Sequence, residues 1–205
     1  MIKIENTQVF GWEAAIRGAR NPMNSWDRSD TEQGKIGPND LDLLKRLSCA
    51  GSDHGKFLRM INVTADITAP LYWWKEYDTY KVGTVANSWS TMHKIHAKEF
   101  TFDNFSHERM TDGCKDVLND IIDALNFERN NYLETHDKAY WENMIQLLPT
   151  SYNQKRTVML NYEVLSNIYK SRKNHKLDEW RELCMWIETL PYSQLITRKE
   201  CEPCG

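Results

Sequence analysis

The stretch from residue 75 to residue 91 holds side chains that are suited to binding a small polar ligand. Charged and hydroxyl side chains follow one another there and run into a series of small hydrogen-bonding groups. Gly83 allows a ligand to approach the backbone closely, because it has no Cβ. The polar residues are Lys75, Glu76, Asp78, Thr79, Tyr80, Lys81, Thr84, Asn87, Ser88, Ser90 and Thr91. Their composition predicts a polar pocket but specifies no reaction.

Three tryptophans lie in or beside this stretch and could stack on a planar ligand: Trp73, Trp74 and Trp89. For any one of them, a place in the hydrophobic core is the commoner outcome. Their clustering favours the wall of a pocket. Both interpretations remain open from the sequence.

Familiar catalytic motifs are missing from the sequence. It has no nucleotide-binding glycine motif, no serine nucleophile elbow and no His-Glu-x-x-His metal site. His93 and His96 form an isolated pair, which we expect to lie on the surface or to be packed. Cys201 and Cys204 have redox or zinc spacing without a second ligand pair, which favours a frayed tail. The five cysteines fit reduced thiols better than a disulfide framework.

The element that precedes the polar stretch is the clearest strand in the sequence. Over residues 61–69 apolar and polar residues alternate strictly, which predicts a strand with one buried face. Pro70 is a typical first helical residue, so a short helix should follow over residues 70–80. Residues 2–12 are a candidate for an edge strand.

Most of the remaining chain shows apolar residues at helical spacing, which predicts an α+β protein with a small sheet and several helices. The first of these helices is expected to be capped by Asn39 and to end near Gly51. Pro149 should stop another. The apolar positions are Leu41, Leu44 and Leu47; Val117, Ile121, Ile122 and Leu125; Tyr140, Trp141, Met144, Ile145 and Leu148; Val158, Tyr162, Leu165 and Tyr169; and Trp180, Leu183, Cys184 and Ile187.

Length and charge limit the kind of protein. A chain of 205 residues suits a single domain over residues 1–205. A net charge of −3 gives no general attraction to nucleic acid or to an anionic membrane. No apolar run approaches the ~20 residues of a membrane helix, and the N-terminus does not read as a signal peptide. We therefore expect a cytoplasmic protein.

Residues 54–84 resemble the central block of the flavin-dependent thymidylate synthases. His54 falls on the first histidine of the family's His-x-[Ser/Thr]-Pro-Phe-Glu-His element, and residues 69–72 fall on its Ala-Pro-[Ile/Leu]-Phe. Glu76 falls on the glutamine of the Gln-x-x-Arg-His-Arg-x-x-Ser signature. Residues 79–81, Thr-Tyr-Lys, fall on the Arg-His-Arg, and Thr84 on the serine.

A second block, from residue 149 to residue 172, resembles the same family without a gap. Asn161 lies on its Asn-x-Arg, Asn167 on its [Asn/His]-Phe, and Arg172 on the arginine that closes this helix. Arg20 is similar to the arginine of the family's Ala-Arg-x-Ser loop.

The resemblance implies a flavin-dependent thymidylate synthase-like fold with a small, mostly antiparallel sheet. It also implies an enzyme that methylates a pyrimidine nucleotide, dUMP or a related one, with methylenetetrahydrofolate, FAD and NADPH, and that assembles as a homotetramer with sites between subunits. Arg172 would be catalytic and face the pyrimidine. The cofactor-binding residues would be His54, Thr79, Tyr80, Lys81, Asn161 and Asn167; the substrate-binding residues would be Glu76, Asn87, Ser88, Ser90 and Arg172. The resemblance implies no metal.

The sequence departs from the family at residues that would bind the substrate. Thr91 and Ile145 stand where the family has two phosphate-binding arginines, and Asn87 replaces a glutamate. Losing two guanidiniums removes the strongest contacts available to a phosphate. Two hypotheses therefore remain. One is an enzyme acting on a different pyrimidine nucleotide or a modified base. The other is a non-catalytic nucleotide- or flavin-binding homologue, or an assembly protein, on the same fold.

Overall fold

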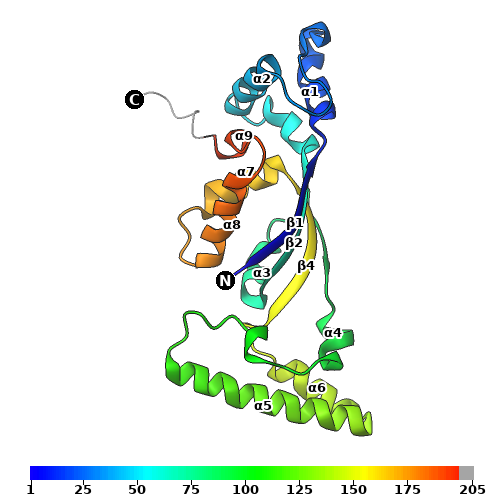
Figure 1. Ribbon diagram of the computed structural model, residues 1–205, viewed down its shortest axis with the longest axis vertical. Coiled ribbons are helices and arrows are strands. Elements are labelled where there is room, and N and C mark those ends of the chain that lie inside the picture. The colour runs from blue at the N-terminus through cyan, green and yellow to red at the C-terminus, as the bar shows by residue number, and fades with distance from the viewer. Residues whose placement is uncertain (199–205) are drawn as a thin grey trace. The chain divides into compact units, whose positions relative to one another are not determined.

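The computed structural model describes residues 1–198, which form two compact units (Figure 1). Unit 1 comprises Met1–Lys3, Ile67–Thr79 and Asn87–Arg156. Within the described residues, unit 2 comprises Ile4–Asp66, Tyr80–Ala86 and residues 157–198. Each unit has its own buried side chains and is described by itself.

The strands of the described residues form one four-stranded sheet in the order β1-β2-β4-β3, and with the surrounding helices they confirm the α+β class. On β2, residues 63, 65, 67 and 69 are buried while their neighbours are half-buried, so the alternation was predicted correctly. The edge strand near the N-terminus is also confirmed, whereas β3 and β4 were not predicted. The bounds are β1 (Lys3–Phe10), β2 (Asn62–Pro70), β3 (Val85–Ser88) and β4 (Asn153–Asn161).

The polar face of the sheet carries a hydrogen-bonded row within unit 2. The carboxylate of Asp66 on β2 accepts a hydrogen bond from the Thr157 hydroxyl of β4 at 2.6 Å. Its other oxygen accepts one from the Asn6 amide of β1 at 2.9 Å. One carboxylate therefore links three neighbouring strands and helps to set their register.

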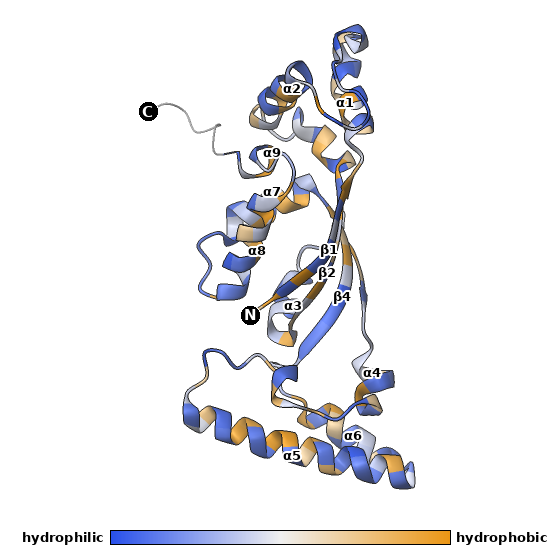
Figure 2. Cartoon of the chain, viewed as in Figure 1, coloured by the Kyte–Doolittle hydropathy of each residue, from blue (hydrophilic) through white to orange (hydrophobic). Residues whose placement is uncertain are grey.

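Unit 1 is built around the helix pair α5 and α6, which lie side by side (Figure 1). Apolar and polar residues are interspersed along α5 (Figure 2), and its buried positions pack on α6 and on the segment before α5. The helices of unit 1 are α3 (Leu71–Tyr77), α4 (Thr91–Lys94), η4 (Ile95–Ala97), η5 (Phe102–Asn104), α5 (Asp112–Thr135) and α6 (Lys138–Leu147). The buried core of this pair is Ile95, Phe100, Phe105, Leu118, Ile122, Leu125, Met144 and Tyr152.

The aromatic residues of α3 belong to the interior of unit 1. Trp73, Trp74 and Tyr77 are at most 2% exposed and pack ring against ring. The Trp74 indole donates to the carbonyl of Gln154 at 2.9 Å, and the Arg156 guanidinium lies 4.3 Å from its ring centre. The hypothesis that Trp73 and Trp74 form a pocket wall is therefore wrong, because both side chains are fully buried.

Unit 2 packs α7 against η3, α8 and α9, and α1 against η3 and α2. Tyr162, Leu165 and Ile168 of α7 are buried, as are Trp180, Leu183 and Ile187 of α8. The helices of unit 2 are α1 (Trp12–Arg20), η1 (Asn21–Met23), η2 (Trp26–Arg28), α2 (Pro38–Cys49), η3 (Gly55–Met60), α7 (Tyr162–Arg172), α8 (Asp178–Thr189) and α9 (Gln194–Thr197).

Three predicted helix boundaries are wrong. Pro70 ends β2 and stands at the cap of α3 instead of beginning the helix. The cap of α2 is Gly37 instead of Asn39, because Pro38 takes the first helical position. Val158 belongs to β4, where it is buried, and the helix begins only at Tyr162.

A buried ion pair joins α1 to α2 in unit 2. The Arg20 guanidinium, 5% exposed, donates from Nε to Oδ1 of the fully buried Asp40 at 2.6 Å. The hydroxyls of Ser29 and Thr31 donate to Oδ2 at 2.8 and 2.6 Å. Burial alone would raise the pKa of Asp40, but the hydrogen bonds from Thr31, Ser29 and Arg20 lower it. This pair ties residues 20–31 to α2.

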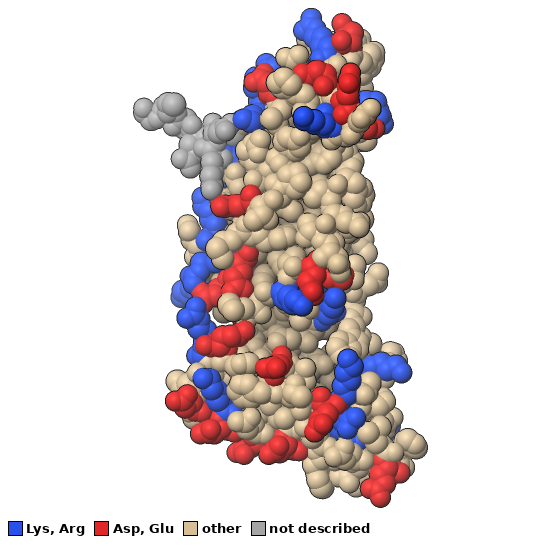
Figure 3. Space-filling model, in the orientation of Figure 1, with Lys and Arg blue, Asp and Glu red and all other residues tan. Residues whose placement is uncertain are grey.

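Charged residues of both signs are interspersed on the face that Figure 3 shows, with acidic side chains gathered along α5. An acidic patch repels the phosphates of nucleic acid. Within residues 1–198, no helix combines the length and apolar character that crossing a membrane requires.

Among the described cysteines, Cys114 and Cys184 are free. The predicted tail containing Cys201 and Cys204 lies outside the described residues.

Candidate functional site

Two residues predicted from separate blocks of the sequence meet in unit 2. Arg172 donates from Nε to the hydroxyl of Tyr80 at 2.9 Å, across a separation of 92 residues. The Arg172 guanidinium lies 4.6 Å from the centre of the Trp180 ring and 5.7 Å from that of Tyr80. The two rings are 5.8 Å apart in an edge-to-face arrangement. We call Tyr80, Arg172 and Trp180 the arginine cluster.

The local sequence explains this arrangement. Arg172 is the last residue of α7, and Trp180 lies in the first turn of α8, so a short loop brings the ring back to the guanidinium. Packing over an aromatic face fixes the plane of a guanidinium and favours its charge. The Tyr80 hydroxyl accepts from Arg172 and still has its own proton to donate. The cluster therefore presents a held cation beside a hydrogen-bond donor.

The segment after Tyr80 passes closely over the start of α7. Asn161 caps α7, because its side-chain oxygen accepts from the backbone N–H of Val164 at 3.0 Å. Gly83 has a φ of +77°, and a Cβ there would lie 2.9 Å from the Asn161 amide nitrogen. Lys81, between Tyr80 and Gly83, is exposed. The glycine thus allows the exposed segment to lie directly on the helix cap.

Gly83→Ala is expected to lower the free energy of unfolding by about 1–2 kcal/mol, since an L-residue with Cβ is strained at this φ. The melting temperature should fall by roughly 2–8 °C in scanning calorimetry. Gly113→Ala is the matched control, because Gly113 is helical and no atom lies within 4 Å of its Cβ position. Equal melting temperatures for the two variants would contradict the close approach.

Two other predicted cofactor residues of unit 2 are exposed. His54 directly precedes η3, and Asn167 lies on α7. Neither side chain takes part in the described contacts of the arginine cluster. Their role with a cofactor remains a prediction.

The predicted residues of unit 1 lie at the end of α3 and along β3. Thr79 donates its hydroxyl to the carbonyl of Glu76 at 2.8 Å. Asn87 and Ser88 are exposed on β3. The Ser90 hydroxyl caps α4 by accepting from the backbone N–H of His93 at 3.0 Å. Within unit 1, these groups are mainly neutral hydrogen-bonding side chains.

The exposed Trp89 differs from the two buried tryptophans of α3. The residue is 44% exposed, while its backbone N–H and its backbone carbonyl are both hydrogen-bonded to β4. Its N–H donates to the carbonyl of Lys155, and its carbonyl accepts from the side chain of Gln154, both at 2.9 Å. Of the three candidate stacking residues, Trp89 alone keeps an accessible ring.

The positions of the two missing arginines have other surroundings. Thr91 is the first residue of α4. Ile145 of α6 is half-buried and packs on the core of unit 1. An apolar side chain in that place offers a phosphate no hydrogen bond.

Sequence reasoning missed two residues that shape unit 2. Trp180 was assigned only to the apolar face of a helix. Its position eight residues after Arg172, at the start of the next helix, could have indicated that its ring packs on the guanidinium. Asp40 was not singled out, because nothing in the local pattern shows that its carboxylate is buried beside Arg20. A cavity of about 810 Å³ lies over that region and is lined by Arg20, Asp27, Arg28 and Arg46 among others. None of the residues assigned to the cofactor or the substrate lines it.

No family model matches the sequence, and no curated protein matches it significantly. Solved structures do match the fold. A flavin-dependent thymidylate synthase, ThyX, from Helicobacter pylori complexed with FAD and dUMP is 16% identical, with a TM-score of 0.71 over 97% of this chain and 99% of that one. A second structure of the same enzyme with FAD and dUMP gives 16% identity and a TM-score of 0.73, over 98% of this chain and 99% of that one.

A third solved structure is a UMP/dUMP methylase, PolB, from Streptomyces cacaoi bound with 5-Br dUMP. It is 15% identical, with a TM-score of 0.62 over 92% of this chain and 89% of that one. At sequence identities this low, the structural matches show the fold alone. The chemistry has to be argued from the residues of the site. The chain has the fold of the flavin-dependent thymidylate synthases.

Proposed function

We propose that the protein binds FAD and a pyrimidine nucleotide, dUMP or a related one, and catalyses reductive methylation of that nucleotide. Methylenetetrahydrofolate would be the carbon donor and NADPH the reductant. Bound FAD would supply hydride transfer, which protein side chains cannot supply by themselves. The observation that carries the proposal is the 2.9 Å contact between Arg172 and Tyr80, two residues that separate blocks of the sequence assign to one pocket.

Arg172 is the proposed catalytic residue. Its guanidinium is held by Tyr80 and the face of Trp180, so its position needs little reorganisation when a ligand arrives. A fixed cation beside a pyrimidine carbonyl stabilises negative charge that develops on that oxygen. Arg172 would therefore orient the base and polarise it.

The segment after Tyr80 fits a cofactor that carries phosphates. Lys81 is exposed and supplies a positive charge, and the Tyr80 hydroxyl supplies a donor. Gly83 leaves room for close approach to the backbone. We assign Thr79, Tyr80 and Lys81 to the FAD diphosphate. His54, Asn161 and Asn167 are assigned to the rest of the cofactor.

The substrate side lacks strong phosphate ligands. Glu76, Asn87, Ser88 and Ser90 supply hydrogen bonds suited to a base or a sugar. Ile145 supplies none. These differences support a pyrimidine nucleotide other than dUMP, or a modified base, as the preferred substrate.

Flavin retention tests the cofactor half of the proposal. The protein is incubated with excess FAD and desalted, and its absorption spectrum is recorded. We expect a retained flavin band, and we expect Lys81→Ala to weaken FAD binding about tenfold or more, since one charge-assisted hydrogen bond is lost.

The matched control is Lys170→Ala, which removes an exposed lysine of α7 outside the proposed site. This variant should retain as much FAD as the parent protein. If the parent shows no band, the protein is no flavoprotein. If Lys81→Ala retains flavin normally, the assignment of residues 79–81 is wrong.

A second candidate function is a non-catalytic homologue that binds a nucleotide or flavin, or that serves in assembly. The loss of arginine at Thr91 and Ile145 favours it. Turnover separates the two candidates: nucleotide and FAD binding without methylated product would support the second.

For either candidate function, the resemblance to the family leads us to propose that the protein forms a homotetramer and acts in the cytoplasm.

A further inference from the structure

A cavity of about 260 Å³ in unit 1 is lined by three of the six histidines of the chain. It lies where α4 and η4 meet the end of α5 and the start of α6. Its polar and aromatic lining consists of His93, His96, Tyr132, His136, Lys138 and Trp141. None of these residues belongs to the site proposed above, and the inference does not depend on that function.

The walls of this histidine cavity are held in place by contacts within unit 1. The Trp141 indole donates to the carbonyl of Met92 at 2.9 Å, which ties α6 to α4. Arg129 donates to the carbonyl of His96 at 2.9 Å, which ties α5 to η4. The His96 ring packs on Tyr132 with ring centres 4.8 Å apart. The cavity is therefore a formed feature of the unit.

One ring nitrogen in this lining has no hydrogen-bond partner among the described residues. Nδ1 of His96 is buried, whereas buried polar atoms are nearly always paired. No aspartate or glutamate is among the lining residues. Two carboxylates close by in the chain are engaged: Asp137 accepts from the backbone N–H of Ala139 at 2.9 Å, and Glu142 pairs with Lys138 at 2.6 Å. The lining thus supplies imidazole and ammonium donors and no carboxylate, and an anion would share Lys138 with Glu142.

The arrangement suits an anion better than a metal ion. Among residues 1–198, no three His, Cys, Asp or Glu side chains are placed to hold one metal ion. A metal ion needs the lone pairs of several ligand atoms to converge on one point. A tetrahedral oxyanion instead accepts hydrogen bonds at separate oxygens, so its N–H donors can come from several sides. Imidazole rings and a lysine ammonium from three segments supply them.

We propose that the histidine cavity binds a phosphate group through His93, His96, His136 and Lys138. Inorganic phosphate and the phosphate of a nucleoside monophosphate offer the same chemistry. The site would be an anion-binding site of unit 1, apart from the site proposed above.

The test is binding of inorganic phosphate and of UMP to the full chain at one pH and ionic strength. Calorimetry measures the affinity, and NMR follows the ring signals of the histidines. We expect saturable phosphate binding that moves the signals of three histidines, and a tenfold or greater loss of affinity in His96→Asn. UMP binding that weakens in the same variant would identify a nucleotide phosphate. Unchanged UMP binding beside weakened phosphate binding would identify free phosphate.

Two further variants keep the test decisive. His93→Asn/His136→Asn changes exposed residues only, so it serves if His96→Asn fails to fold. His107→Asn is the control, because His107 contacts Phe105 and Phe102 outside the cavity. Absence of saturable binding in the parent protein would overturn the proposal, as would equal affinities in the cavity variants and the control. Failure here leaves the flavin test above unaffected.

Discussion

Asp40→Ala is expected to lower the free energy of unfolding by about 3–5 kcal/mol, because it leaves the buried guanidinium of Arg20 without its counter-ion. The Ser29 and Thr31 hydroxyls would also lose the oxygen that accepts from them. For a chain of this length, the melting temperature should fall by roughly 6–20 °C. Scanning calorimetry or urea unfolding followed by tryptophan fluorescence measures the change.

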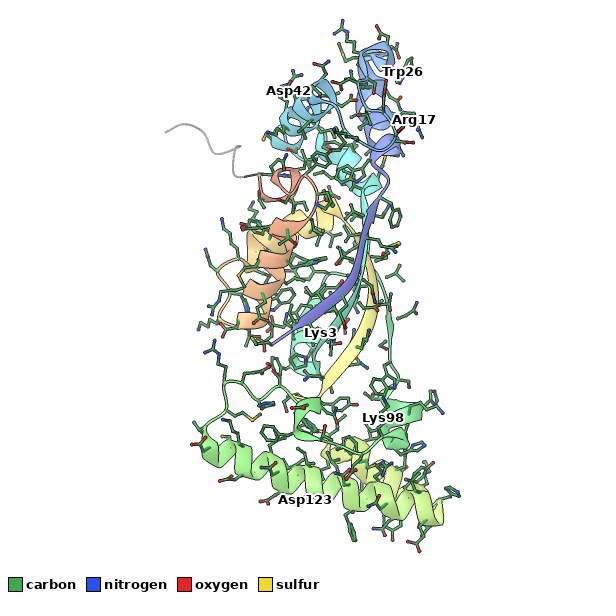
Figure 4. All side chains as sticks on the ribbon, in the orientation of Figure 1. Lys3, Arg17, Trp26, Asp42, Lys98 and Asp123 are labelled. Carbon is green, nitrogen blue, oxygen red and sulfur yellow. The ribbon has the colours of Figure 1, made fainter. Side chains whose placement is uncertain are left out.

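Asp42→Ala is the matched control for this variant. Asp42 lies on the same helix, two positions later, but it is 67% exposed and pairs at 3.0 Å with Arg46, which is 71% exposed. Figure 4 labels Asp42 on α2. Its removal should change the melting temperature little, because exposed pairs contribute little to stability. Similar losses for both variants would show that the buried pair has no special role.

The same carboxylate predicts a dependence on pH. Since the pKa of Asp40 is lowered in the folded protein, its contribution is present above about pH 4, the ordinary range for an aspartate. It is lost as the pH falls through the lowered pKa. The stability difference between the parent protein and Asp40→Asn should therefore shrink as the solution is acidified. A difference that grows on acidification would contradict the assignment.

Arg172→Ala is expected to lower kcat for nucleotide methylation by about 100–1000-fold, as removal of one preorganised electrostatic group does in other enzymes. The reason is the position of its guanidinium, which Tyr80 and Trp180 hold in place. Binding of UMP and dUMP should weaken as well. Turnover assays and calorimetry measure the two effects separately.

Arg172→Lys and Lys173→Ala show whether the effect is specific. The first keeps a positive charge but loses the planar stacking on Trp180, so it should be intermediate. The second removes the neighbouring exposed cation, whose Nζ lies 5.9 Å from the Tyr169 ring centre, and should behave as the parent does. Unchanged turnover and nucleotide affinity in Arg172→Ala would remove the basis of the proposed function. A loss confined to thermal stability would make the arginine cluster structural.

Local patterns in the sequence were sufficient where one periodicity had no competitor. The alternation over residues 61–69 gave a strand because successive side chains of a strand point to opposite faces. The spacing of Trp180, Leu183 and Ile187 gave a helix for the corresponding reason. Val158 was misassigned because its spacing to Tyr162 also fits a helix. Its strand depends on pairing between β4 and β2, which no local pattern contains.

The sequence by itself determined which chemical groups are present: a cation at Arg172, an apolar side chain at Ile145, and hydrogen-bonding groups along residues 76–90. Only the tertiary structure decided which of them meet. It buried Trp73 and Trp74 in unit 1 and left Trp89 accessible, since burial depends on which surface covers each ring. It brought Arg172 to Tyr80, 92 residues away in the chain, because the segment after Tyr80 passes closely over the start of α7.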